Sequence, residues 1–119
     1  MVRLDLHLHT ARHSPCAEAL APDALAPRAA AAGLQGVVLS EHDVLWDQAE
    51  LAVLQAAQPG LRLYRGLECT VQGAHLLVVG LVHTRGLRRR QPLQEAVAAA
   101  HEQGAAVVLA HPYRDGDPE

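Results

Sequence analysis

The chain has 119 residues, half of them hydrophobic, which is enough apolar material for one core and too little for two. Its formal net charge of -3 gives no positive field that would predict binding to nucleic acid or to an anionic membrane. The longest apolar run, residues 76–82, is too short to span a bilayer. Two distant cysteines, Cys16 and Cys69, and a start that lacks the pattern of a signal peptide lead us to expect a cytoplasmic protein.

The first predicted elements are a strand and a helix. Aliphatic and polar residues alternate over residues 4–9 (LDLHLH) with the period of a strand, so one face is aliphatic and the other carries three polar groups. A helix is predicted over residues 23–32, with Asp23 as its N-cap and Gly33 as its C-terminal stop.

The next stretch continues the alternation of strands and helices. A short buried strand is predicted over residues 36–40, a helix over residues 47–57 and a strand over residues 61–68. Too few residues separate this strand from the aliphatic run at 75–82 for a parallel crossover, so the two are expected to form a hairpin that turns near Gly73.

The last predicted elements are a helix over residues 92–103 and a strand over residues 106–110. Strands and helices therefore alternate through most of the chain, which is typical of the α/β class.

Histidines and one carboxylate follow the predicted strands at the same end of the sheet. The carboxyl ends of strands form the active face in parallel α/β architectures. Burying unpaired polar groups costs roughly 2–7 kcal/mol each, and neutral imidazole is the commonest protein ligand of metals, so a metal site is predicted. Asp5 could orient one of the ligands. The residues are His7 and His9 on the first strand, His42 after the second, Glu68 on the third and His111 after the fifth.

Five short segments, DLHLHT, SEHD, GLECT, AHLLVVG and LAHP, occur in an order that resembles the PHP (polymerase and histidinol phosphatase) family. The resemblance implies an α/β fold that is the N-terminal portion of a distorted, seven-stranded TIM-like barrel. Residues 1–119 would form a PHP-like domain that lacks the family's C-terminal strand or strands, because no closing Asp-x-His segment follows His111.

The resemblance also implies a cluster of two or three divalent transition metal ions, Mn, Zn or Fe, with Glu68 as the bridging carboxylate. His75 is preferred to His83 as a further ligand because the hairpin returns it to the side of Glu68. His13 and Cys16 stand where the family has another ligand, and their role stays open. The expected metal ligands are His7, His9, His42, Glu68, His75 and His111.

The function expected from this resemblance is hydrolysis of a small-molecule phosphoester. Glu68 and His42 are the predicted catalytic residues, and Arg114 is the predicted donor to the substrate phosphate. Two ions roughly 3.5–4 Å apart would hold the attacking hydroxide, so no side-chain nucleophile is required. Ser14 and Ser40 lie outside any nucleophile elbow.

Other interpretations remain open at this point. A noncatalytic PHP-like module would keep metals for structure or partner contact, and an open barrel edge would favour self-association. The arginines at positions 85 and 88–90 either hold a phosphate or form a solvated loop, and His101 is expected on a helix surface.

Overall fold

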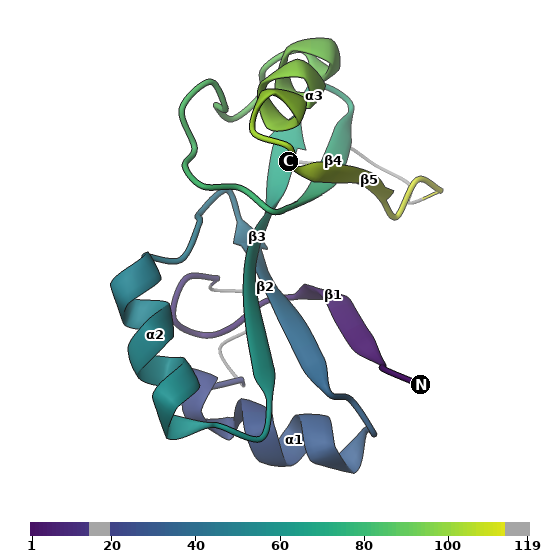
Figure 1. The fold of residues 1–119 in the computed structure, drawn as a ribbon. Coiled ribbons are helices and arrows are strands. Elements are labelled where there is room, and N and C mark those ends of the chain that lie inside the picture. Colours follow the sequence, from purple (N-terminus) through teal and green to yellow (C-terminus); the bar gives the residue numbers. More distant parts are fainter. Residues whose placement is uncertain (15–19, 114–119) are drawn as a thin grey trace.

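The computed structural model describes residues 1–14 and 20–113. Five strands form one sheet in the order β1-β2-β3-β4-β5 (Figure 1). The strands are β1 (Leu4–Leu8), β2 (Gly36–His42), β3 (Arg62–Val71), β4 (Ala74–Val79) and β5 (Ala106–Ala110). β1, β2 and β3 run parallel, whereas β4 runs antiparallel to both β3 and β5.

Three short helices connect the strands: α1 (Leu25–Ala31), α2 (Gln48–Ala57) and α3 (Leu93–Glu102). A 3-10 turn, η2 (Pro22–Ala24), precedes α1 and contains Asp23. The prediction of Asp23 as the N-cap is therefore wrong, since Ala24 holds that position without a side-chain cap. Gly33 ends this helix region at a φ of +75°, as predicted. None of the helices described is long and apolar enough to cross a membrane.

The strand β3 contributes residues to both hydrophobic core clusters of the molecule. Its first half packs Leu63 with β2 and α1, and its second half packs Leu67 with β4 and α3. Figure 1 shows the same division, with α1 and α2 beside the parallel strands and α3 beside β4 and β5. Residues of β3 that point away from these helices face the other side of the sheet.

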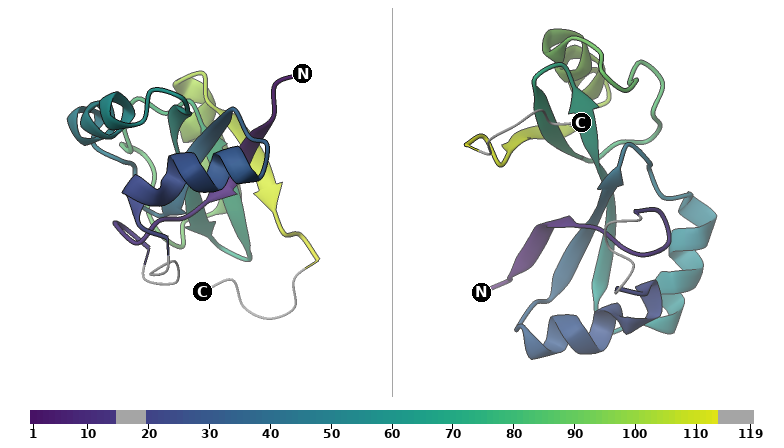
Figure 2. Two further views of the ribbon diagram at one scale, coloured as in Figure 1. Left: turned by 90° about the horizontal axis from the view of Figure 1, so that it is seen from below. Right: turned by 180° about the vertical axis from the view of Figure 1, so that it is seen from behind.

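The hairpin between β3 and β4 turns at Gly73, whose φ is +76°, and this confirms the prediction. The sheet curls so far that its two edge strands approach each other. The rings of His7, on β1, and His111, just after β5, lie 5.8 Å apart although four strand pairings separate their strands. Both edge strands lie on the same side of β3 in the views of Figures 1 and 2.

The predicted fold class, the N-terminal portion of a TIM-like barrel, is wrong. Such a barrel repeats parallel strands that are each followed by a helix. Here the tight hairpin reverses the chain after β3, and β4 is antiparallel to both neighbours. The described residues form a mixed five-stranded sheet, curled into a half-barrel, with three short helices. Of the barrel expectation, only the curl is retained.

Candidate metal centre

Glu68 lies at the centre of the curled face of the sheet and is 1% exposed. Its neighbours Leu67 and Cys69 point into the core beneath α3, so the alternation of β3 directs the Glu68 side chain to the opposite face. Five imidazoles surround its carboxylate: two come from β1 and the residue after it, and the others from β2, β4 and the end of β5.

The two carboxylate oxygens of Glu68 face different histidines. Oε1 lies 2.8 Å from His7 Nε2, 2.9 Å from His9 Nε2 and 3.6 Å from His42 Nδ1. Oε2 lies 2.7 Å from His75 Nδ1 and 2.9 Å from His111 Nε2. These last two imidazole nitrogens are themselves 3.2 Å apart. All six residues expected from the sequence are thus brought together.

The strands explain this convergence. His7 lies on β1 and His9 directly after it, and His42, the last residue of β2, is in register with Glu68. His75 is paired across the hairpin with Thr70, two residues beyond Glu68 on the same face. His111 follows Ala110, the β5 partner of His75.

Two subsets of ligand atoms share Glu68. One consists of His7, Glu68 and His111, and the other of His9, His42 and Glu68. Within each subset the ligand atoms lie within 4.8 Å of one another. Imidazole and carboxylate donors suit first-row divalent ions, so the residues fit the metals that the sequence resemblance implies. One buried carboxylate common to two such groups can serve two ions.

Glu68 and the histidines around it shift one another's pKa values. Burial raises the pKa of the Glu68 carboxyl, but hydrogen bonds from His9, His7 and His111 outweigh it and leave the pKa well below its usual range. The hydrogen bond to Glu68 raises the pKa of His9 against the opposing effect of burial. Burial, and then the neighbouring His9, lower the pKa of His42, which favours its neutral, metal-binding form.

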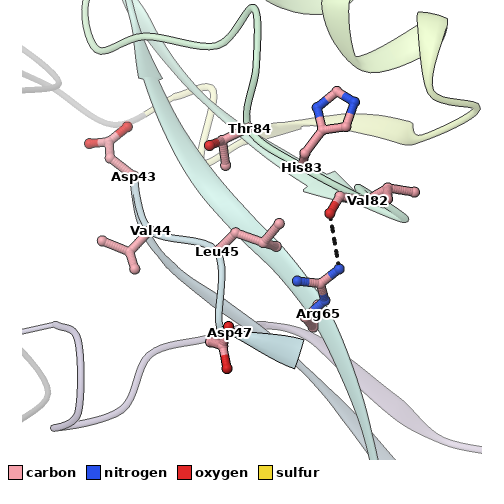
Figure 3. Close-up of a pocket in the computed structure, with 8 residues that line it drawn as sticks. All are labelled: Asp43, Val44, Leu45, Asp47, Arg65, Val82, His83 and Thr84. Carbon is pink, nitrogen blue, oxygen red and sulfur yellow. Dashed lines mark hydrogen bonds between the residues drawn. The ribbon is translucent and has the colours of Figure 1, made fainter. Parts of the chain in front are cut away.

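Other residues singled out from the sequence lie elsewhere. His83 lines a cleft of about 470 Å³ with Arg65, Asp43 and Asp47 (Figure 3), and Glu68 is not among the residues that line it. His13 packs edge-on against Trp46, and His101 is exposed on α3. Cys16 and Arg114 fall outside the residues that the structure describes.

Asp5, Ser14 and Ser40 have structural contacts in place of the roles considered for them. Asp5 accepts a hydrogen bond from the backbone N–H of His7 at 3.0 Å rather than from an imidazole. Ser14 is 1% exposed and Ser40 is fully buried, and both hydroxyls are hydrogen-bonded within the fold. Neither serine is presented to a substrate.

The arginine segment lies beside the end of β2. Arg89 Nε is 3.7 Å from Asp43 Oδ2, and Arg88 pairs with Glu95 on α3 at 3.3 Å. The backbone N–H of Arg90 donates to Thr70 O at 2.7 Å, so this loop is joined to β3 just beyond Glu68. Arg88 and Arg89 line a small pocket with Leu67 and Cys69, whose side chains point away from the Glu68 face of the sheet.

Sequence reasoning missed Glu41 and Asp43, which flank His42. Glu41 is fully buried and hydrogen-bonded to the segment after His9, and Asp43 accepts from the backbone and hydroxyl of Thr70. The available signal was the SEHD segment itself, because two carboxylates around a histidine at the end of a buried strand need partners. Which partners they find depends on tertiary contacts.

No protein-family model matches this chain, and no curated protein matches it. A solved structure from Bacteroides vulgatus ATCC 8482 does: a two-domain protein containing a predicted PHP-like metal-dependent phosphoesterase. The two share 25% sequence identity with a TM-score of 0.64. The similarity covers 89% of this chain and 34% of the other, so this chain spans about a third of that protein's length. The resemblance found in the sequence thus has support from a distant structural neighbour.

Proposed function

We propose that this chain binds two divalent metal ions around Glu68 and that the centre serves the hydrolysis of a phosphoester. The observation that carries the proposal is the sharing of one buried carboxylate by two groups of ligand atoms. The similarity to the Bacteroides vulgatus protein, which contains a predicted PHP-like metal-dependent phosphoesterase, supports the same reading. Manganese and zinc are the metals we favour, because imidazole and carboxylate donors accommodate both.

Glu68 supplies the negative charge of the centre. Its low pKa keeps it ionised in neutral solution, and its burial prevents water from screening that charge. Bound divalent ions would polarise a phosphoryl oxygen and neutralise the charge that develops during displacement at phosphorus. The histidines would determine where the ions bind, since their strands hold them within hydrogen-bonding distance of Glu68.

His42 is the histidine best suited to a second role. Its Nδ1 is 3.6 Å from Glu68, the longest of the five separations, and its side chain is 35% exposed. Its lowered pKa favours the neutral imidazole, whose one unprotonated ring nitrogen can either hold an ion or accept a proton from the attacking water, but not both at once. We propose His42 and Glu68 as the catalytic residues on these grounds.

A small-molecule phosphoester is the substrate class we propose. His7 and His111 are each about one-third exposed, so a phosphate group can reach the centre from solvent. Arg114 remains our candidate for a bidentate contact to that phosphate, on the strength of its position three residues after His111.

The decisive experiment combines metal content with turnover for Glu68→Gln. Gln keeps the shape of the side chain but removes the charge shared by the two groups, so we expect loss of at least one ion per chain and of Mn-dependent hydrolysis of p-nitrophenyl phosphate and bis(p-nitrophenyl) phosphate. Glu95→Gln is the matched control, because this glutamate is 55% exposed and pairs only with Arg88 among the described ion pairs. A Glu68→Gln variant that binds as much metal as the parent would refute the proposal.

The same measurement separates catalysis from a purely structural metal site. If the parent binds metal that Glu68→Gln loses, but neither ester is hydrolysed with Mn or Zn, the centre is a noncatalytic metal-binding module for these substrates. If turnover accompanies the bound metal and both disappear together, the hydrolase proposal stands.

A further inference from the structure

Glu41 is a fully buried carboxyl group that the centre itself does not use. It lies on β2 directly before His42 and points to the opposite face of the strand. Its oxygens accept hydrogen bonds from Thr10 N at 2.8 Å, Ser14 Oγ at 2.7 Å and Trp46 Nε1 at 2.8 Å, and also from the Thr10 hydroxyl. All four donors are neutral groups.

Burying a carboxylate among neutral groups costs free energy because the charge loses its contact with water. A buried carboxylate without a counter-charge is tolerated only when its acceptor positions are filled, and four donors fill them here. Apolar residues of similar volume commonly stabilise a core as well or better. Glu41 is therefore better explained by the segments that its hydrogen bonds hold in place than by a gain in core stability.

The first connection runs to His9. The pairing of β1 with β2 is irregular between Asp5 and Leu8, and the strand ends at Leu8. At Leu8 and beyond it, side chains of β2 accept hydrogen bonds from the backbone: Ser40 Oγ accepts from Leu8 N at 2.9 Å, and Glu41 accepts from Thr10 N. His9 is held between these two anchored residues.

The second connection runs to His42. Ser14 Oγ donates to Glu41 and accepts from the backbone N–H of His42 at 3.4 Å. His9 and His42 are stacked with their ring centroids 4.1 Å apart, and both belong to the subset that contains Glu68. The hydrogen bonds of Glu41 therefore end beside the two histidines of one subset, whereas His7, His75 and His111 are held by other contacts.

We propose that Glu41 is a positioning residue that fixes His9 and His42 relative to each other and so sets the metal affinity of the His9–His42–Glu68 group. None of the four hydrogen bonds of Glu41 reaches His7 or His111, the histidines of the other group. This inference rests on the proposed metal site but adds a residue and a selectivity that the site alone does not specify.

The test uses the full chain with Glu41→Gln. In this variant an amide NH2 group replaces one of the two accepting oxygens, so it can no longer accept from the donors that face it. Competition titration with Zn²⁺ and a chelator should show the affinity of one of two binding steps falling by about 10- to 100-fold, the range expected when a residue supporting a metal ligand is changed. Gln58→Met is the control: Gln58 is 6% exposed and bonds Ala26 N and Pro22 O near the start of β3, far along the sheet from Glu68. It should lower stability while leaving both zinc affinities unchanged.

Ser14→Ala provides a milder variant in case Glu41→Gln does not fold, because it removes one donor and leaves three. In the metal-free protein, imidazole ¹H–¹⁵N correlation spectra should then show shifts for His9 and His42 and none for His75 and His111. Zinc affinities within twofold of the parent in the folded variants, or equal shifts of all four imidazoles, would overturn the inference. If the parent binds no zinc, the proposed function fails, and the spectra of the metal-free protein alone decide the role of Glu41.

Discussion

At the level of single residues, backbone strain is concentrated around Glu68. The described non-glycine residues with positive φ are Asp43 at 55°, Arg90 at 64° and His111 at 27°. Asp43 N donates to Glu68 O at 2.9 Å, and Arg90 N donates to Thr70 O, two residues further along β3. Strain of this kind persists where surrounding contacts over-determine the conformation, and it clusters at functional sites.

Asp43 allows this strain to be tested. Its carboxylate accepts from Thr70 N at 2.7 Å and Thr70 Oγ1 at 2.8 Å. Asp43→Ala removes both acceptors and places alanine at positive φ, so we expect a loss of about 2–4 kcal/mol in the free energy of unfolding. Asp43→Asn keeps one acceptor and tolerates the conformation, so the loss should be about 0.5–1.5 kcal/mol. Urea unfolding of the metal-free proteins measures both losses, and a loss within about 0.5 kcal/mol for Asp43→Ala would show that neither contact matters.

The six residues of the centre could be predicted because five of them stand at or near the carboxyl end of a predicted strand, and the predicted hairpin returns His75 to the same edge. His7, His42 and Glu68 needed only the order of the elements and the rule that parallel strands end at one edge. Whether they bind metal stays a prediction. Glu41 could not be assigned in the same way, because its donors on Thr10, Ser14 and Trp46 are brought to it by the irregular end of β1 and by the loop before α2.

At the level of elements, β3 depends on a close approach at Gly66. A Cβ added there would lie 2.7 Å from Val38 Cγ1 and 2.7 Å from the Val78 carbonyl oxygen. Gly66→Ala should therefore destabilise the protein by about 1–3 kcal/mol, because the backbone of β4 would have to move. Gly60→Ala is the control, since nothing lies within 4 Å of its added Cβ, and the change expected is within about 0.5 kcal/mol. Thermal and urea unfolding would expose an error if both variants behaved alike.

The helices, the strands and the hairpin were largely predictable, but the architecture of the complete sheet was not. Hydrophobic periodicity and the Gly33 and Gly73 signals marked the helices and the hairpin close to their observed positions. The barrel interpretation, which the family resemblance implied, failed because the chain reverses after β3 and leaves β4 antiparallel to both of its neighbours. Nothing local in residues 106–110 specifies that β5 pairs antiparallel with β4, since such a pairing is decided by long-range packing.

At the level of the whole molecule, the curl of the sheet brings its edges together at the metal centre. β1 and β5 are the edge strands of the described sheet, and apolar side chains on both remain half-exposed, including Leu4 at 44% and Val108 at 46%. The contact between His7 and His111 links these edges through Glu68. An ion held by this group would therefore restrain the two strands that are otherwise least supported.

This coupling predicts that metal protects both edges of the sheet from hydrogen exchange. Saturating Zn²⁺ or Mn²⁺ at about 100 times Kd stabilises the folded state by about 2.7 kcal/mol, and the amides of β1 and β5 should slow with it because ion binding joins their ends. His111→Ala should abolish the gain in β5 and reduce it in β1, while protection of β2 still rises through the His9–His42–Glu68 group. The control is His101→Ala, which alters an exposed histidine on α3 and should exchange like the parent.

Deuterium uptake followed by mass spectrometry measures the exchange of β1, β2 and β5 separately. Should metal slow β5 as much in His111→Ala as in the parent, the ion does not join the edges, and the curl must be maintained by the packing of the sheet alone.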